Sequence, residues 1–166
     1  MNLKTTVLAA AAALILTPAV AMAATEQFPI QVTVEATVPS ATGLQISPVG
    51  DWAGQTQNMR WNIATQRLDP ILQQVDIKSG LGAINAYLTT EAMLTSAGNA
   101  IDLTVAVAGQ DLQVGAANAV EVATATEAAA SKRAAVAITA AAPTGESYVQ
   151  GTYQGNVFMM FESGTP

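Results

Sequence analysis

The chain has 166 residues and a formal net charge of −6, and it contains neither histidine nor cysteine. Its length fits one domain, and the missing imidazoles and thiols exclude His- or Cys-based catalysis and the usual zinc and copper ligands. The acidic balance, together with basic runs of no more than two residues, argues against a nucleic-acid partner.

The N-terminus has the pattern of a secretory signal peptide. Lys4 precedes an apolar run at residues 7–16, and Ala21-Met22-Ala23 fits the small-residue site that a signal peptidase reads. The run is too short to span the hydrocarbon core of a membrane, which takes about 20 residues. Export is therefore favoured over a retained membrane anchor. Removing residues 1–23 from 166 leaves 143 residues with a charge of −7. Without disulfides, and with a core rich in alanine, this exported domain is expected to benefit from a partner.

The first segment of the mature chain is the clearest strand. Residues 28–38 alternate apolar and polar side chains, and one face carries Phe28, Ile30, Val32, Val34, Ala36 and Val38. A terminal tail is usually polar and frayed, so an amphipathic strand about 36 Å long, at roughly 3.3 Å per residue, must pair with something. It forms either the first strand of its own sandwich or an added strand on another copy, and periodicity by itself favours the former.

The rest of the chain is mostly short strands separated by turn residues. The strand-like runs are residues 59–63, 71–77, 83–88, 101–108, 119–124 and 133–140, and Gly109 to Asp111 predicts a hairpin loop. Residues 148–162 predict a long closing strand with Tyr153, Gly155, Val157, Met159 and Phe161 on one face. Helix competes only at residues 126–133, where Thr124 or Thr126 could cap it, and the sequence leaves this segment open. The spacing of the strands predicts an antiparallel β-sandwich.

Residues that could carry out chemistry are scarce. No phosphate-loop, dinucleotide, calcium-loop or Ser-x-x-Lys motif occurs. The carboxylates are well separated in sequence and are expected to be solvated surface charges, including Asp69, Asp76, Glu91, Asp102 and Asp111. Trp61 alternates with Met59 and Ile63 and is expected in the core, whereas Trp52 is the better candidate for surface recognition. We therefore expect no catalytic residue, metal site or cofactor.

Five segments in order carry a resemblance to a known family. They are VTVEATVP (32–39), VAVAGQDL (105–112), TATEAAA (124–130), AITAAAP (137–143) and GTYQGNVFMMFES (151–163). In this order, behind a signal peptide, they resemble the alpha-type major pilins of the alternate chaperone–usher pathway, which include colonisation-factor and cable pilins. The resemblance implies an all-β, incomplete immunoglobulin-like antiparallel β-sandwich completed by a donor strand. The expected division is a signal peptide at 1–23, a donor strand at 24–39 and a sandwich domain at 40–166.

The resemblance also implies a function. The chain would be the major structural subunit of a surface fimbria, exported through the periplasm, and would support adhesion. Each copy would insert its N-terminal strand into a neighbouring copy, in a groove lined by Tyr153, Val157, Met159 and Phe161 that a periplasmic chaperone contacts first. The other partners would be an outer-membrane usher and a tip adhesin. The alternative function is an autonomous secreted β-sandwich that binds a ligand.

Overall fold

The computed structural model describes residues 43–145 and 147–164, which belong to one compact unit at residues 37–166. The predicted signal peptide and the predicted strand at 28–38 lie outside the described residues. The described elements in chain order are β1 (Gln45–Pro48), β2 (Trp61–Asn62), β3 (Arg67–Leu68), β4 (Ile71–Lys78), β5 (Ile84–Leu88), β6 (Met93–Ser96), β7 (Asn99–Val107), β8 (Gln110–Asp111), η1 (Ala116–Asn118), β9 (Val120–Ala123), α1 (Ala125–Ala130), β10 (Lys132–Ala140) and β11 (Met159–Ser163).

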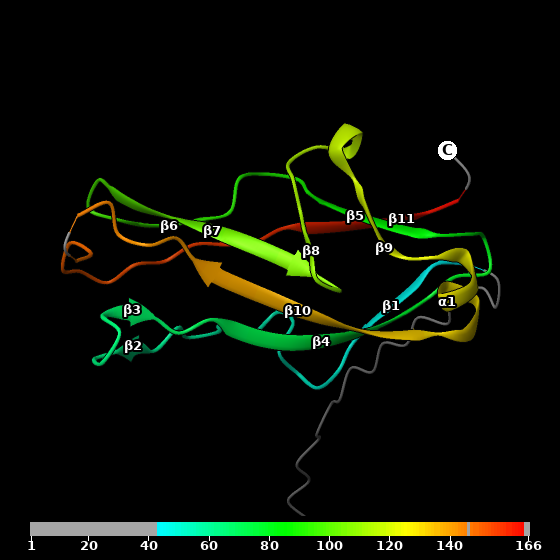
Figure 1. The fold of residues 1–166 in the computed structure, drawn as a ribbon, viewed down its shortest axis with the longest axis horizontal. Coiled ribbons are helices and arrows are strands. Elements are labelled where there is room, and N and C mark those ends of the chain that lie inside the picture. The colour runs from blue at the N-terminus through cyan, green and yellow to red at the C-terminus, as the bar shows by residue number, and fades with distance from the viewer. Residues whose placement is uncertain (1–42, 146, 165–166) are drawn as a thin grey trace, which may run out of the picture. The chain divides into compact units, whose positions relative to one another are not determined.

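The strands form two sheets and a separate hairpin, as Figure 1 shows. The larger sheet has the order β1-β4-β10-β7-β6, with β8 paired to β7, and the smaller sheet has the order β11-β5-β9. Strands β2 and β3 pair only with each other. All these ladders are antiparallel. The sandwich predicted from the strand spacing is therefore confirmed.

The core lies between the two sheets and follows the two-residue period of the strands. In β10, Ala134, Val136 and Ile138 are buried, and the residues between them are exposed or half-buried. Val136 lies opposite Val107 of β7 in the ladder, so both point to the same face. The smaller sheet contributes the buried side chains Ile84, Ala86 and Leu88 of β5. Alternation alone thus indicated correctly which side of these strands faces inward.

The segment that the sequence left open, residues 126–133, is helical up to Ala130, whereas Lys132 and Arg133 already belong to β10. Thr124 is the N-cap of α1: its hydroxyl accepts from the Glu127 backbone N–H, and the Glu127 side chain accepts from the Thr124 N–H. This capping box satisfies two backbone donors that would otherwise lack partners. Ala128 is fully buried, and its carbonyl accepts from the Ser79 N–H at 3.0 Å. The short helix therefore closes one end of the core. In the described residues no helix is long and apolar enough to cross a membrane.

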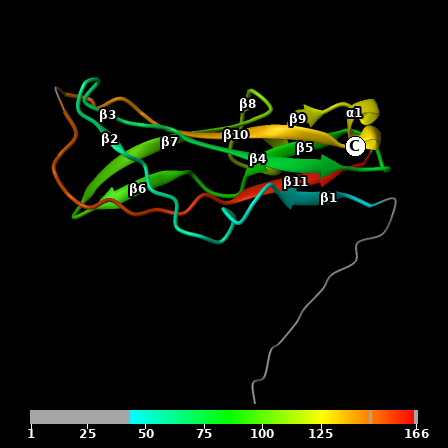
Figure 2. The same ribbon diagram turned by 90° about the horizontal axis from the view of Figure 1, so that it is seen from below.

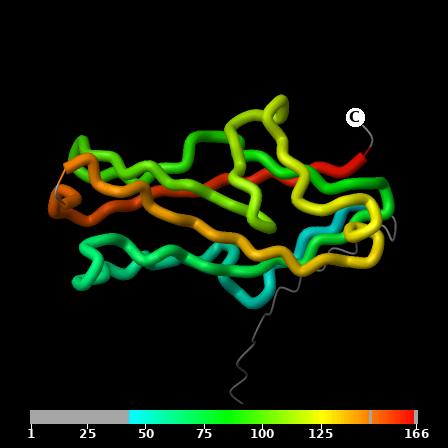
Figure 3. The backbone as a smooth tube through the Cα atoms, viewed as in Figure 1, coloured from blue at the N-terminus to red at the C-terminus, as the bar shows by residue number. Residues whose placement is uncertain are grey.

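The predicted closing strand is wrong in extent. Strand β11 covers only Met159–Ser163, and before it only Gln154 pairs, in an isolated bridge with Thr95 of β6. The tube in Figure 3 shows this last segment running the length of the domain. It pairs first with β6 in the larger sheet and then with β5 in the smaller one, so no continuous ladder forms. Strand β6 itself was not predicted.

The two tryptophans have the reverse of their predicted exposure. Trp61 is 48% exposed and Ile63 is 83% exposed, because the hairpin that carries them packs outside the core. Trp52 is half-buried against the core, and its indole N–H donates to the Gln74 carbonyl at 3.0 Å. Trp61 instead meets Tyr148 edge to face, with ring centroids 6.1 Å apart.

Candidate functional site

Among the described strands, the outer edge of β11 is a free edge of the smaller sheet. Strand β11 pairs with β5 on one side, and no strand in the described residues pairs with the other. Met159 lies opposite the buried Leu88, and Phe161 lies opposite the buried Ala86, so both side chains point inward. They pack against the core but stay half-buried. An edge strand with inward apolar side chains that are not fully covered can receive a further strand.

Strand β1 and the residue before it, at the edge of the larger sheet, also have apolar side chains that are only half-buried. Ile46 lies opposite the buried Ile77 of β4, and Leu44 and Ile46 are half-buried against the core. Figure 2 shows β1 and β11 along the same side of the domain. Five half-buried apolar side chains lie on or just before these two strands, and we call them the edge row: Leu44, Ile46, Val157, Met159 and Phe161. The edge row is where both sheets have apolar surface left to bury.

The four predicted groove residues do not all lie together. Val157, Met159 and Phe161 belong to the edge row. Tyr153 lies apart, in the loop before β11, and its hydroxyl donates to the Val149 carbonyl at 2.9 Å. Leu44 and Ile46 were missed, although the alternation of Leu44 and Ile46 with polar neighbours was a weak signal for them. The six predicted donor residues, Phe28, Ile30, Val32, Val34, Ala36 and Val38, lie outside the described residues.

The position of Val157 depends on a close backbone approach at Gly155. A Cβ atom added there would lie 2.0 Å from the Met93 carbonyl oxygen of β6. Beside it, the Thr95 and Gln154 backbones exchange two hydrogen bonds of 2.9 and 3.1 Å. Further on, the Thr89 N–H donates to the Phe158 carbonyl at 3.1 Å. Residues 154–158 are therefore fixed to the domain on one side before β11 begins.

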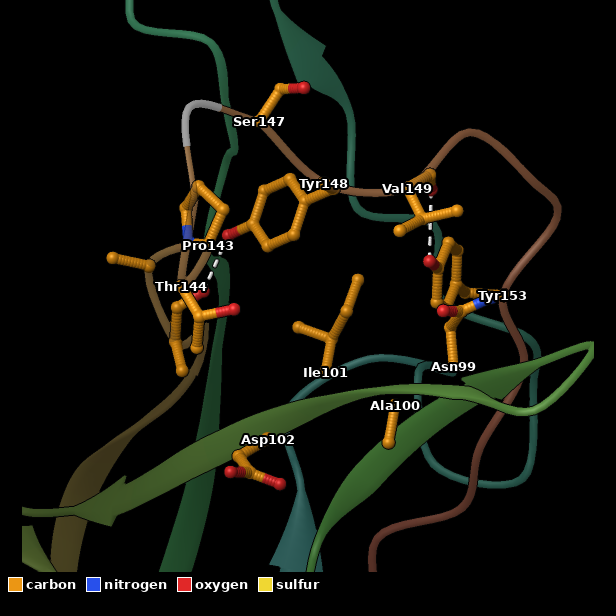
Figure 4. Close-up of a pocket in the computed structure, with 12 residues that line it drawn as sticks. Asn99, Ala100, Ile101, Asp102, Pro143, Thr144, Ser147, Tyr148, Val149 and Tyr153 are labelled. Atoms are coloured by element: carbon orange, nitrogen blue, oxygen red, sulfur yellow. Dashed lines mark hydrogen bonds between the residues drawn. The ribbon is translucent and has the colours of Figure 1, made fainter.

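The loop that carries Tyr153 covers a cavity of about 210 Å³ at the start of β7, near Asn99. Figure 4 shows Ile101 pointing up between Tyr148 and Tyr153, whereas Asp102 points away on the far side of the strand. The Tyr148 hydroxyl donates to the Ala141 carbonyl, so both tyrosine hydroxyls are satisfied within the loop. The cavity is space left beneath the loop, and none of the described residues that line it aims a charged group into it.

Two ion pairs and one group of carboxylates stand out among the described charged side chains. Arg133 binds Asp76 through two hydrogen bonds, which lower the pKa of Asp76 and raise that of Arg133. The Thr124 N–H, and then Lys132, lower the pKa of Glu127. Three carboxylates that are distant in sequence line one shallow pocket: Glu91, Asp102 and Asp111. No group of acidic side chains in the described part of the chain is arranged to hold a metal ion.

Comparison with known proteins identifies the family. Residues 29–162 match the family model described as the CS1 type fimbrial major subunit. The structure is similar to that of the CooA pilin subunit from enterotoxigenic Escherichia coli, with a TM-score of 0.56 and 15% sequence identity over 72% of this chain and 88% of that chain. This likeness supports an immunoglobulin-like β-sandwich. No curated protein sequence matches the chain. The family match covers most of the chain, which therefore belongs to the CS1 type fimbrial major subunits, the structural pilins that polymerise into a surface fimbria.

Proposed function

We propose that the subunit polymerises by donor-strand exchange, with residues 28–38 of one copy added to the free edge of β11 in the next. The observation that carries the proposal is the edge row. Ile46 lies on β1 of one sheet, Met159 and Phe161 lie on β11 of the other, and Leu44 and Val157 lie just before these strands; all five side chains are only half-buried. The inward face of the added strand offers six apolar side chains to cover them.

The lengths of the two partners support a long contact. Residues 28–38 extend over about 36 Å, whereas the five residues of β11 cover about 17 Å at roughly 3.3 Å per residue. An added strand would therefore continue beyond β11 along residues 154–158. That segment is already fixed on its other side by Thr95 and Thr89. We expect it to become part of β11 when the strand is added.

The same edge explains why such a subunit needs help before assembly. An unpaired edge with apolar side chains beside it favours aggregation, and a periplasmic chaperone that supplies a temporary strand would prevent this. An outer-membrane usher would then exchange the chaperone strand for that of the next subunit. We propose a shaft role, with a separate tip adhesin, through which the fimbria would support adhesion. The route to the cell surface would begin with removal of residues 1–23.

The test compares Val34→Asp with Thr33→Asp. Val34 lies on the apolar face of residues 28–38 and Thr33 on the polar face. A carboxylate forced into an apolar groove costs several kcal/mol, so Val34→Asp should abolish fibres and leave exported subunit bound to the chaperone, while Thr33→Asp should polymerise normally. Electron microscopy and sedimentation of surface-sheared protein measure both outcomes. Equal polymerisation of the two variants would refute strand exchange.

A further inference from the structure

The hairpin of β2 and β3 presents exposed apolar and cationic side chains together. Ile63 at its tip is 83% exposed and Trp61 is 48% exposed. Arg60 and Arg67 are also exposed, and neither makes an ion pair with any described residue. In both Figure 1 and Figure 2 the hairpin lies at the opposite end of the domain from α1. The protein is acidic overall, so the two exposed arginines beside exposed apolar side chains set this hairpin apart from the rest of the surface.

The outer face of the smaller sheet has the complementary chemistry. Phe158 is 56% exposed, and Met160, which is 45% exposed, lies opposite Tyr87. The next row of the same face brings Glu162 and Glu121 to either side of Asn85. An apolar patch thus adjoins two carboxylates that form no ion pair among the described residues. We call Phe158, Met160, Tyr87, Glu162 and Glu121 the outer patch.

An added donor strand would not cover the outer patch. Apart from Pro29 at the start, the side chains of residues 28–38 that would share its face are polar: Gln31, Thr33, Glu35 and Thr37. Phe158 and Met160 would then stay exposed on a finished fibre and available to a different partner.

We propose that the β2–β3 hairpin of one copy binds the outer patch of another copy. Ile63 and Trp61 would cover Phe158 and Met160, and Arg60 and Arg67 would approach Glu162 and Glu121. The two surfaces are different parts of the same chain, so the contact is heterologous, and a heterologous contact can repeat along a filament. It deepens the proposed function, because it adds a second contact between copies that strand exchange links.

The charge pattern makes a second copy the best-matched occupant. Copies of an acidic protein repel one another, and a local cationic surface is attracted to the two carboxylates of the outer patch, which offsets part of that repulsion. Of the three described cations without an ion pair, Arg60, Arg67 and Lys78, two lie on the hairpin. A second weak contact between subunits that are already linked gains from their high effective concentration.

The test uses the absence of cysteine from the chain. In fibres of the double variant Ile63→Cys/Met160→Cys, disulfides should join one copy to the next, because the contact brings the two positions together in an oxidising compartment. Boiled, non-reduced samples should show a ladder of multimers on a denaturing gel, and reduction should collapse it to monomer. Adding Arg60→Glu and Arg67→Glu should cause loss of the ladder, and further adding Glu121→Arg and Glu162→Arg should restore it.

The control is Leu72→Cys/Met160→Cys. Leu72 is 70% exposed on the outer side of β4, and the proposal gives it no partner. Fibres without a ladder from the Ile63 pair, or an equal ladder from the control, would overturn the hairpin contact and leave strand exchange standing. A ladder together with equal polymerisation of Val34→Asp and Thr33→Asp would uphold the hairpin contact and refute strand exchange.

Discussion

The sharpest stability prediction concerns Gly155, where the last segment passes against β6. In Gly155→Ala the new Cβ would lie 2.0 Å from the Met93 carbonyl oxygen, and non-bonded carbon and oxygen rarely approach closer than about 3.3 Å, so the backbones must separate by about 1 Å. Overpacking of this kind costs about 1–3 kcal/mol. Weakening the two adjacent hydrogen bonds between Thr95 and Gln154 destabilises the fold by about a further 0.5–1.5 kcal/mol each. Alanine also makes the unfolded chain stiffer, which offsets about 0.4–1 kcal/mol of this loss.

The net loss in the free energy of unfolding should therefore be about 1–6 kcal/mol. For a domain of this size that corresponds to a fall in Tm of about 4–24 °C, measurable by circular dichroism or calorimetry. Gly145→Ala is the matched control, because a Cβ there meets nothing within 4 Å and the backbone φ is not positive. If Gly155→Ala melts with the control and the unaltered protein, the close approach does not constrain the segment before β11.

Three further predictions address the edge row, the helix cap and the tryptophans. Val157→Lys should reduce the amount of subunit in the periplasm, because it places a charge in the edge row, whereas Phe158→Lys, on the exposed side, should not; equal amounts on immunoblots would contradict this. The pKa of Glu127 is lowered in the folded state, so its stabilising effect is complete above the ordinary value of 4.5 and is lost as the pH falls through the lowered pKa. Glu127→Gln should remove that part of the acid dependence of Tm, and an unchanged dependence would count against the cap. Trp52→Ala should lower Tm more than Trp61→Ala, and the reverse order would contradict their burial.

The sequence predicted the strands whose burial follows their own alternation. The residues of β10 alternate between Ala, Val or Ile facing inward and smaller or polar residues facing outward, and this strand pairs on both sides. Strand β6, with the sequence MLTS, has no such alternation. It forms because β7 offers an edge to it, from Met93 opposite Asp102 to Ser96 opposite Asn99. A strand held mainly by its neighbour leaves little periodic signal of its own.

The candidate site was predictable in part for the same reason. Alternation placed Val157, Met159 and Phe161 on one face, and the structure brings these three into the edge row. It also added Tyr153 to that face, because a period of two cannot show that the chain changes from one sheet to the other at Gly155. The reversal of the tryptophans has a related cause. Alternation shows that a segment has an apolar side but not which other element covers it.

The central claim is that the subunit is completed by a strand from another copy. A mature chain that begins near Ser40 would lack six apolar side chains, and at roughly 1.5–3 kcal/mol for each large one the lost burial is on the order of 10 kcal/mol. That is comparable with the whole stability of a small domain. Such a chain should therefore aggregate or unfold.

The most direct measurement attaches residues 28–38 after Pro166 of that shortened chain through a flexible linker. Strand β11 runs toward Pro166, so the attached segment can turn back along its free edge at an effective concentration in the millimolar range. Light scattering and thermal melting should then show a stable monomer, while the unaltered mature chain forms oligomers. A mature chain that is already monomeric, melts cooperatively and is no less stable than the chain with the attached strand would show that residues 28–38 complete their own fold.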